Sequence, residues 1–386
     1  MDKDEWIKAC LAEAGLDAFL LKLPENVLYL TGYWPCYGWS TCLYPSNGEP
    51  ILLLPDFEAS FAEGCSVKDV RLLEKGDLSS ATVKTLKEVV SEKGLSLHRI
   101  GIEGSFETIS VAHMGGEIHV PTTGFFESTR KVLPNVTLVD ATQILHKMRS
   151  IKGPSDVEGL KRVSEVALRG LSAALERVQE GIKECEVAAA VEAEVYGTAI
   201  GLRGIRRARA YAFVMSGPNS ANAYWPFNIS SERKLRRGDL VLIELNTLVD
   251  GYWSDLTRIW TCGSPSQRQE EIYEAVYGAF VGAVRSVKEG VKASHLLETS
   301  EKHLKDHGLG NYFYPFLGHG IGVGLHEPIP RLTPESRDVF KAGMVHTVEP
   351  GVYIKDFGGV RIEDVVLVKK DGWTNLSETK YALDEV

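Results

Sequence analysis

The sequence predicts two domains of different classes, an α/β domain over residues 1–147 and an α+β domain with a curved antiparallel sheet over residues 148–386. A length of 386 residues exceeds one ordinary domain and favours two. Helical and strand-like patterns alternate up to about residue 140, which is typical of an α/β domain. The second half instead has long helices and then short strands joined by glycine-rich turns, which indicates an α+β domain.

The elements of the first domain are expected from hydrophobic periodicity and turn residues. We expect helices over residues 4–14 and 80–93, and strands over residues 17–21, 26–30, 51–54, 99–102 and 136–139.

The junction falls at residues 146–154, where Pro154 starts a new helix and Ser155 and Glu158 are spaced as a capping box. Apolar residues then recur on one helical face as far as Val178. The sequence further predicts helices over residues 185–199, 267–288 and 294–307, strands over residues 211–215, 239–245 and 252–261, and more strands in about the last 70 residues.

Composition narrows the class of protein and its partners. The chain is 44% hydrophobic and 25% charged, as in a globular protein with a large core. A net charge of −9 argues against a nucleic-acid partner. The six cysteines are scattered, which predicts reduced thiols and a cytoplasmic location, and no apolar run is long enough to span a membrane. We interpret one basic cluster as a solvated surface or an interface stripe: Arg203, Arg206, Arg207 and Arg209.

Five residues of the second domain form a spaced set of candidate metal ligands: Glu244, Asp255, His319, Glu349 and Glu363. Four carboxylates and one imidazole suit two divalent cations such as Mn²⁺, Co²⁺ or Zn²⁺ better than a structural zinc site, which favours thiolates. Paired cations activate a water molecule and polarise a carbonyl group, which is the chemistry of amide hydrolysis.

The local sequence around each candidate supports this interpretation. Glu244 and Asp255 flank the turn at residues 249–252, so a hairpin would bring them to one cavity. The glycines around His319 allow the backbone to pass close to a bulky or charged group. Glu349 and Glu363 lie in apolar stretches, where a carboxylate needs compensation. Buried ion pairs with Arg361 are the alternative to cations.

The order and spacing of these signatures resemble those of the pita-bread metallopeptidases, which include methionine aminopeptidase, aminopeptidase P, prolidase and the metal-free creatinase. Residues 24–32, Pro-Glu-Asn-Val-Leu-Tyr-Leu-Thr-Gly, are similar to the N-terminal domain of prolidase, aminopeptidase P and creatinase, and residues 149–156 are similar to the start of their second domain. The resemblance implies a creatinase/prolidase-type N-terminal domain, a pita-bread catalytic domain, a homodimer, and a loop at residues 33–40 that closes over the partner's site.

The resemblance also implies a role for each residue. Asp255 and Glu363 would bridge two metal ions, His319 and Glu349 would complete the shell of one, and Glu244 that of the other. Three further roles are implied for residues of the same motifs: His326 would contact the substrate and stabilise the tetrahedral intermediate, Arg361 would orient Glu363 or Asp255, and Glu349 would move the proton.

Three positions depart from the family pattern. Glu244 stands in Glu-Leu-Asn where the family has Asp-x-Gly, and its side chain is longer by about 1.5 Å, against a tolerance of about 0.2 Å for ligand distances. Tyr224 replaces a histidine that bonds to substrate, and it donates a hydrogen bond without a positive charge. Pro315 replaces a histidine common in proline-specific members.

The function that we expect is hydrolysis of the amide bond of Xaa-Pro dipeptides or short peptides through a dinuclear metal-bound hydroxide. The alternative is a creatinase-like or ectoine-hydrolase-like enzyme that cleaves a C–N bond of a small non-peptide substrate. Such a reaction needs no metal if Glu244 acts as a nucleophile or base. The segment Tyr-Gly-Trp-Ser (37–40) is similar to ectoine hydrolases. A third hypothesis is an inactive binding module.

Overall fold

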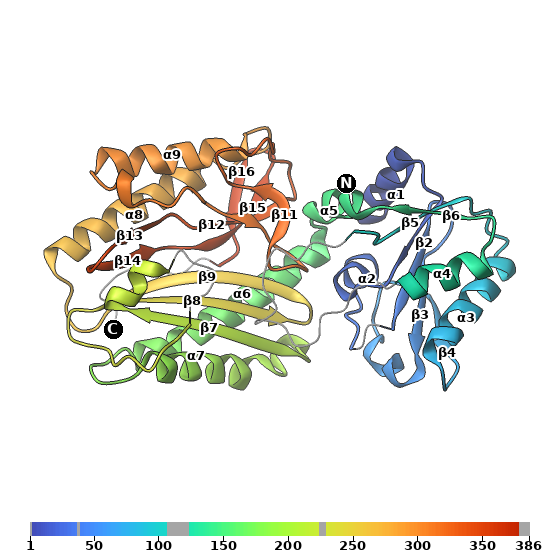
Figure 1. The fold of residues 1–386 in the computed structure, drawn as a ribbon, viewed down its shortest axis with the longest axis horizontal. Helices are drawn as coiled ribbons and strands as arrows, with labels where there is room; N and C mark the ends of the chain where they lie inside the picture. Colours follow the sequence, from blue (N-terminus) through green and yellow to red (C-terminus); the bar gives the residue numbers. More distant parts are fainter. Residues whose placement is uncertain (1, 37–38, 106–122, 224–228, 378–386) are drawn as a thin grey trace. The chain divides into compact units, whose positions relative to one another are not determined.

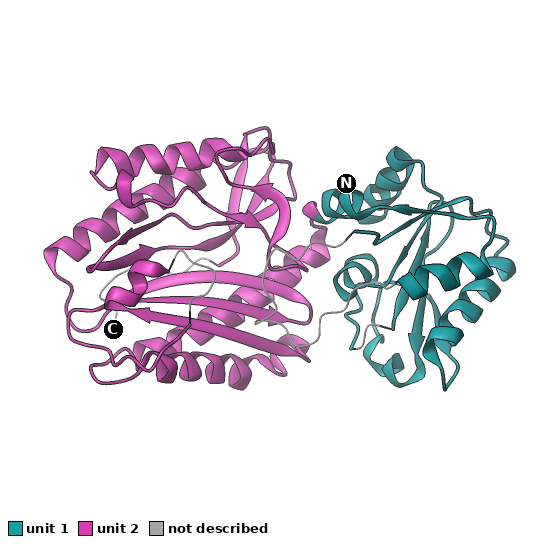
Figure 2. Cartoon of the chain, in the orientation of Figure 1, with its two compact units in different colours: residues 1–149 teal, residues 150–386 magenta. Residues whose placement is uncertain are grey.

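The computed structural model describes residues 2–36, 39–105, 123–223 and 229–377. These residues form two compact units, residues 1–149 and residues 150–386 (Figure 2). The predicted domain boundary, between residues 147 and 148, lies two residues before this division. Among the described residues, no helix has both the length and the apolar character that a bilayer span requires.

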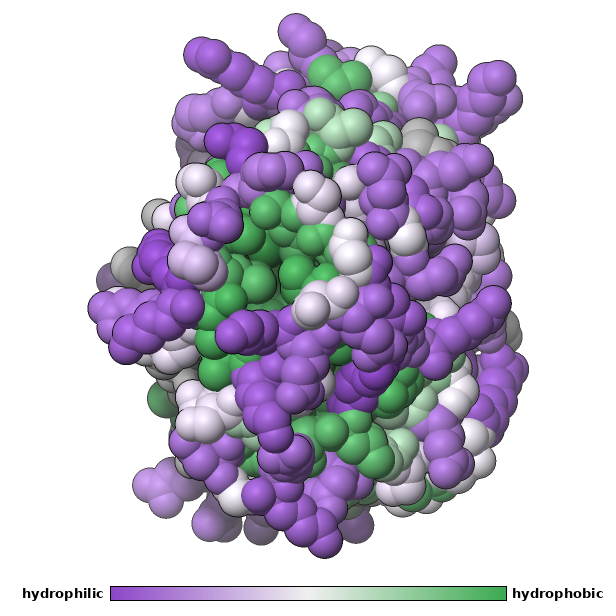
Figure 3. Space-filling view, turned by 90° about the vertical axis from the view of Figure 1, so that its right-hand side faces the viewer, coloured by the Kyte–Doolittle hydropathy of each residue, from purple (hydrophilic) through white to green (hydrophobic). Residues whose placement is uncertain are grey.

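Unit 1 contains a six-stranded mixed sheet in the order β4-β3-β2-β1-β5-β6 (Figure 1). Strand β2 pairs antiparallel with both β1 and β3, whereas the other neighbours are parallel. The strands are β1 (Ala18–Leu21), β2 (Thr41–Pro45), β3 (Ile51–Pro55), β4 (Asp69–Leu73), β5 (Arg99–Ile102) and β6 (Thr137–Asp140). The helices are α1 (Lys3–Ala14), α2 (Pro24–Thr31), α3 (Leu78–Glu92), α4 (Thr123–Val132) and α5 (Thr142–Ser150). On the face in Figure 3, hydrophilic side chains surround a hollowed area where hydrophobic side chains gather.

The predicted strand at residues 26–30 is wrong, because these residues lie in helix α2. The helix is buried on all sides, so its apolar run carries no helical periodicity, and a short run of this kind is also typical of a buried strand. Its start depends on a distant residue. The Glu103 carboxylate accepts hydrogen bonds from the backbone N–H groups of Lys22 and Leu23 and from the side chain of Asn26.

The described part of unit 2 contains two larger antiparallel sheets with helices on their outer sides, and a two-stranded hairpin (Figure 1). The three-stranded sheet has the order β7-β8-β9, with β7 (Ala208–Ser216), β8 (Leu240–Val249) and β9 (Tyr252–Thr261). Helices α6 (Pro154–Leu175) and α7 (Glu184–Ala199) pack against it. The five-stranded sheet has the order β11-β10-β12-β15-β16, with β10 (His319–Gly320), β11 (Glu327–Arg331), β12 (Val345–Val348), β15 (Asp364–Lys369) and β16 (Gly372–Asn375).

Helices α8 (Gln267–Arg285) and α9 (Ala293–Asp306) cover the five-stranded sheet. A separate hairpin, β13 (Gly351–Ile354) and β14 (Gly358–Arg361), also contacts the three-stranded sheet. A backbone bridge between Thr257 and Glu363 links β9 to the segment just before β15. This bridge brings Glu363 next to β9, so polar residues of the two sheets meet in the interior of unit 2.

Helix α6 begins at Pro154 as predicted, but the predicted capping box is wrong. The backbone N–H of Gly153 donates to the Asp156 carboxylate at 2.8 Å, so Gly153 is the cap and Asp156 the third helical residue. Proline is favoured at the first helical position because its missing N–H has no partner there in any case. With Pro154 at that position the cap lies two residues before Ser155, and only the Asp156 half of a capping box forms because glycine has no side chain. Ser155 and Glu158 remain exposed.

Strands β8 and β9 form the predicted hairpin, and β9 has the predicted bounds. Its two-residue turn has positive φ at both central positions, 46° at Asp250 and 91° at Gly251. This is the pattern of a type I′ turn, whose twist matches that of the flanking strands. The turn sets the register Asn246↔Asp255 and Glu244↔Thr257.

Candidate active site

The β8–β9 hairpin supplies the first two candidate ligands. Because Glu244 pairs with Thr257 and Asn246 with Asp255, all four side chains project from the same face of the sheet. Asp255 is buried, and the Asn246 Nδ2 donates to its Oδ1 at 2.6 Å. The Asp255 Oδ2 lies 3.5 Å from the Nε2 of His319.

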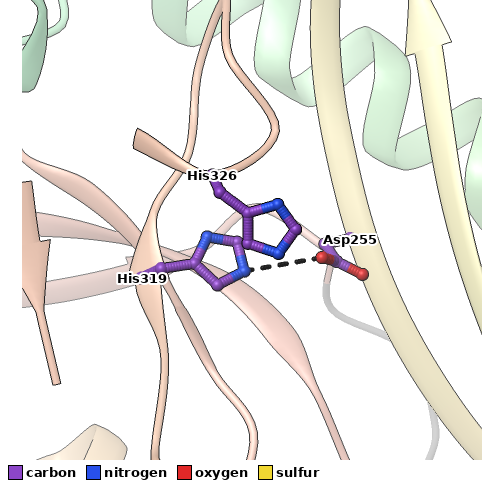
Figure 4. Close-up of side chains that lie close together, drawn as sticks. All are labelled: Asp255, His319 and His326. Carbon is purple, nitrogen blue, oxygen red and sulfur yellow. Dashed lines mark ion pairs between the residues drawn. The ribbon is translucent and has the colours of Figure 1, made fainter. Parts of the chain in front are cut away.

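His319 reaches Asp255 from β10 of the five-stranded sheet, which is paired with β11 on one side and β12 on the other, and Figure 4 shows both histidine rings directed towards the carboxylate. The Nδ1 of His319 bonds to the carbonyl oxygen of Gly320 at 2.9 Å, which leaves Nε2 facing Asp255. Although burial lowers it, the hydrogen bond to Asp255 and the charge of Glu349 leave the pKa of His319 above its ordinary value.

The glycines around His319 are required by neighbouring backbone. A Cβ at Gly318, where φ is 154°, would lie 2.2 Å from the carbonyl oxygen of Thr347, and one at Gly320 would lie 2.3 Å from that of Ile329. The expected close approach therefore takes place between backbone segments of this chain. It holds β10 tightly between its neighbours and so positions the His319 imidazole.

The His326 ring lies against the His319 ring, with centroids 4.2 Å apart and the planes tilted by 37°. Burial and the neighbouring His319 lower the pKa of His326 to about 3. This ring is therefore neutral at pH 7 and has one N–H to donate. Its Nδ1 is buried and has no hydrogen-bond partner among the described residues, so it retains bonding capacity for a ligand.

Glu349 and Glu363 complete the cluster around His319. The Glu349 Oε1 lies 3.8 Å from the His319 Nε2 and accepts a hydrogen bond from the Thr347 hydroxyl. Burial raises the pKa of Glu349 to about 7, against the lowering effect of His319 and Arg361. Burial and the charge of Asp255 raise the pKa of Glu363 well above its usual range.

Arg361 pairs with a different carboxylate from the expected one. Its Nη2 lies 2.5 Å from the Glu244 Oε2, whereas we expected Glu363 or Asp255 as the partner. The reason is the bond from its Nε to the Thr257 hydroxyl at 3.0 Å, since Thr257 lies opposite Glu244 in the hairpin. Burial raises the pKa of Glu244, and the charge of Arg361 opposes that shift.

The donor set fits a divalent cation at the His319 end. Among the described residues, two groups have ligand atoms within 4.8 Å of one another: Asp255, His319 and His326, and His319, Glu349 and Glu363. The Glu363 Oε1 is buried with no hydrogen-bond partner, while its Oε2 accepts from the Thr257 hydroxyl. A buried carboxylate oxygen without a donor is costly unless a cation compensates it. Neither group includes Glu244.

The remaining positions that the sequence analysis singled out lie outside the described residues or away from the cluster. Tyr224 lies outside the described residues, as do Tyr37 and Gly38 of the 33–40 loop. Pro315 is exposed in the segment before β10.

Sequence reasoning missed several residues that hold the charged side chains of the site, among them Asn246, Thr257 and Tyr353. Asn246 is the last residue of the Glu-Leu-Asn motif, where the family has glycine, and this difference could have indicated a role in the site. Tyr353, whose hydroxyl accepts from the Arg361 Nη1, had no such signal.

Comparison with known proteins identifies the family. Residues 158–370 match the model of metallopeptidase family M24, and residues 5–151 match the creatinase/prolidase N-terminal domain. The Xaa-Pro dipeptidase of Pyrococcus horikoshii is 32% identical over 368 residues, which cover 95% of this chain and 94% of that protein. The Xaa-Pro dipeptidase of Pyrococcus furiosus is 32% identical over 371 residues, covering 96% of each.

Solved structures agree with these matches. The prolidase from Pyrococcus horikoshii superimposes with a TM-score of 0.78 at 32% identity and covers 99% of both chains. An X-Pro aminopeptidase from Thermotoga maritima, at 24% identity and a TM-score of 0.80 over 97% of this chain and 99% of its own, shares the fold. The predicted resemblance and fold class are confirmed: the chain belongs to metallopeptidase family M24 and carries a creatinase/prolidase N-terminal domain.

Proposed function

We propose that this protein hydrolyses the amide bond of Xaa-Pro dipeptides or short peptides with a divalent cation. The observation that carries the proposal is the convergence of His319, Glu349 and Glu363 on one point, with a partnerless buried oxygen on Glu363. Its relatives named Xaa-Pro dipeptidase cover nearly the whole chain. The creatinase-like and ectoine-hydrolase-like alternative is not favoured by these relatives.

Different residues of the site have different roles in the proposed hydrolysis. His319, Glu349 and Glu363 would hold the cation, which would supply polarisation of the scissile carbonyl and a lowered pKa for a water molecule. Glu349, with one oxygen oriented by Thr347, accepts a proton from that water and delivers it to the leaving nitrogen. His326, neutral at pH 7, donates its N–H to the carbonyl oxygen as negative charge develops there.

The finer properties of the enzyme are part of the same proposal. The residue types of the ligand set suit two Mn²⁺, Co²⁺ or Zn²⁺ ions. The hydrogen bonds of Glu244 to Arg361 and of Asp255 to Asn246 affect whether a second ion binds beside Glu244. We propose that Tyr224 contacts the polar end of the substrate and that Arg361 orients the site carboxylates. The scattered cysteines support a cytoplasmic enzyme. The family resemblance supports a homodimer in which residues 33–40 close over the partner's site.

A dipeptide assay tests this function. Chelated protein is supplied with Mn²⁺, Co²⁺ or Zn²⁺ and given a panel of Xaa-Pro dipeptides, with creatine and ectoine as competing substrates. We expect hydrolysis before proline that stops on addition of a chelator. Glu363→Gln should lower kcat/KM by about 10³-fold or more, whereas the exposed control Glu335→Gln should leave it unchanged. Hydrolysis of creatine or ectoine without any Xaa-Pro cleavage contradicts the proposal.

A further inference from the structure

The two ends of the carboxylate cluster differ in what neutralises them. At the His319 end, Glu363 has a buried oxygen with no partner, and Glu349 and Asp255 face the same imidazole. At the Glu244 end, the charges are already compensated by this chain's own donors. A cation at that end must displace those donors before it binds.

Asn246 is the first of these donors. It lies in the middle of β8, is 1% exposed, and stands directly opposite Asp255 in the hairpin. Its Nδ2 donates to the Asp255 Oδ1 at 2.6 Å and is close enough to Glu244 to stabilise the charged form of that carboxylate. An amide NH₂ that donates to two neighbouring carboxylates reduces the repulsion between them as a small bridging cation would, because its hydrogens carry partial positive charge.

Arg361 is the second donor, and it holds Glu244 on the opposite side. Its Nη2 lies 2.5 Å from the Glu244 Oε2. The guanidinium is fixed by Thr257, by the hydroxyl of Tyr353 and by the carbonyl oxygen of Ala223. With three other bonds in place, the guanidinium cannot swing away from Glu244 without leaving buried N–H groups unpaired.

The length of Glu244 adds to this difference. The extra methylene relative to aspartate extends the carboxylate by about 1.5 Å, whereas ligand distances tolerate about 0.2 Å. In this structure the added length carries the carboxylate to Arg361. Among the described residues, the atoms of Glu244 belong to neither of the two groups with metal-ligand spacing.

We propose that this enzyme holds one divalent cation, at the His319 end, and that the Asn246 amide occupies the place where a second would bridge Glu244 and Asp255. The proposal rests on the proposed function, because it concerns the cation of the same site. Asp255 then gives Oδ2 to the cation side and Oδ1 to Asn246. Glu244 acts with Arg361 as a fixed charge pair beside the cation.

Counting cations tests the proposal without using activity. Chelated protein is titrated with Mn²⁺, passed through a desalting column, and examined by metal analysis and electron paramagnetic resonance. The wild-type protein should retain one equivalent with the six-line spectrum of an isolated ion, even when loaded at a tenfold excess. Two retained equivalents, or a spectrum of spin-coupled manganese, overturn the proposal.

Two substitutions locate the cause. Asn246→Ala removes the donor and should bind a second equivalent at least tenfold more tightly than the wild type does. Asn246→Asp keeps the shape of the side chain and adds a carboxylate, so it should also gain a second equivalent. Thr247→Val is the matched control, since this neighbour projects from the other face of β8 and its buried hydroxyl has no partner among the described residues. It should retain one equivalent.

The outcomes separate this inference from the proposed function. If both Asn246 variants remain at one equivalent while folded, as judged by circular dichroism, the role assigned to the amide is overturned. One equivalent without hydrolysis of any Xaa-Pro dipeptide overturns the function and leaves the cation count standing. Two equivalents together with hydrolysis overturn the cation count and leave the function standing. Protein that binds no cation overturns both.

Discussion

Thr257 shows how one hydroxyl group positions two charged side chains of the site. It donates to the Glu363 Oε2 at 2.7 Å and accepts from the Arg361 Nε at 3.0 Å. The first bond leaves the other oxygen of Glu363 for a cation, and the second turns the guanidinium towards Glu244. Thr257 belongs to neither group of candidate ligands, but it determines where the side chains of Glu363 and Arg361 point.

We expect Thr257→Val, which keeps the shape of the side chain, to weaken Mn²⁺ binding by about 10-fold to 100-fold. It should also lower the free energy of unfolding by about 1–3 kcal/mol, because the buried Arg361 Nε loses its partner. Titration calorimetry and urea unfolding of the chelated protein measure the two effects. Thr247→Val should change neither, and equal effects in both variants would contradict the assigned role.

At the scale of elements, the β8–β9 hairpin sets the geometry of half the site. Its turn has two positive φ values, and its register brings Glu244, Asn246, Asp255 and Thr257 onto one face. A shift of one residue would turn all four side chains to the opposite face of the sheet. The conformation of a two-residue turn therefore decides which polar groups meet the second sheet.

Gly251→Val should lower the free energy of unfolding by about 1–3 kcal/mol, because a β-branched residue at φ 91° is strained. The matched control is Gly197→Ala in the exposed part of α7, where a Cβ meets nothing within 4 Å. That change should stabilise the protein by about 0.5–1 kcal/mol, since alanine favours a helix interior. Urea unfolding of both variants checks the opposite signs, and a stable Gly251→Val protein would argue against the turn geometry.

At the scale of the whole molecule, cation binding should be visible as stability. A ligand that binds only the folded state adds about 2.7 kcal/mol when present at 100 times its Kd. We expect the thermal midpoint of chelated protein to rise on addition of Mn²⁺ and to return with chelator. His319→Ala should abolish the rise, whereas substitution of the exposed His295 with alanine should preserve it. A rise of equal size in His319→Ala would place the cation elsewhere.

The N-terminal unit has its own pH dependence, centred on Glu103. Burial raises its pKa to about 7 from an ordinary value of 4.5, so the folded state binds more protons than the unfolded state between those pH values. The free energy of unfolding contributed by this group is highest below about pH 4.5 and falls as pH rises to about 7. A shift of this size corresponds to about 3 kcal/mol.

Glu103→Gln does not titrate, so it should lose about 2 kcal/mol less stability than the wild type between pH 5 and pH 8. Urea unfolding of chelated protein at pH 5 and pH 8 measures the loss of stability of each protein. Subtracting the loss of the variant from that of the wild type cancels the contributions of other groups. Glu335→Gln serves as an exposed control and should follow the wild type. Parallel losses in the wild type and Glu103→Gln would show that Glu103 titrates normally.

The sequence by itself determined the family, the two fold classes and most element positions, because these depend on residue types and on local periodicity. Strand β9 was predicted with its observed bounds, and α7 to within one residue. Where the local pattern was uninformative the prediction failed: residues 26–31 of α2 are all buried, and their apolar run was taken for a strand. The cap of α6 was misplaced because two overlapping pairs have the same spacing.

Only the tertiary structure decided which polar groups are paired. Arg361 and Glu244 are 117 residues apart in the chain, and nothing in either motif indicates that they meet at 2.5 Å. The contact of Asn246 with Asp255 depends on the register of a hairpin, and that of Thr257 with Glu363 depends on how two sheets meet. Hydrogen bonds and ion pairs act over a few ångströms, so a linear motif names the donors and acceptors, whereas the fold selects their partners.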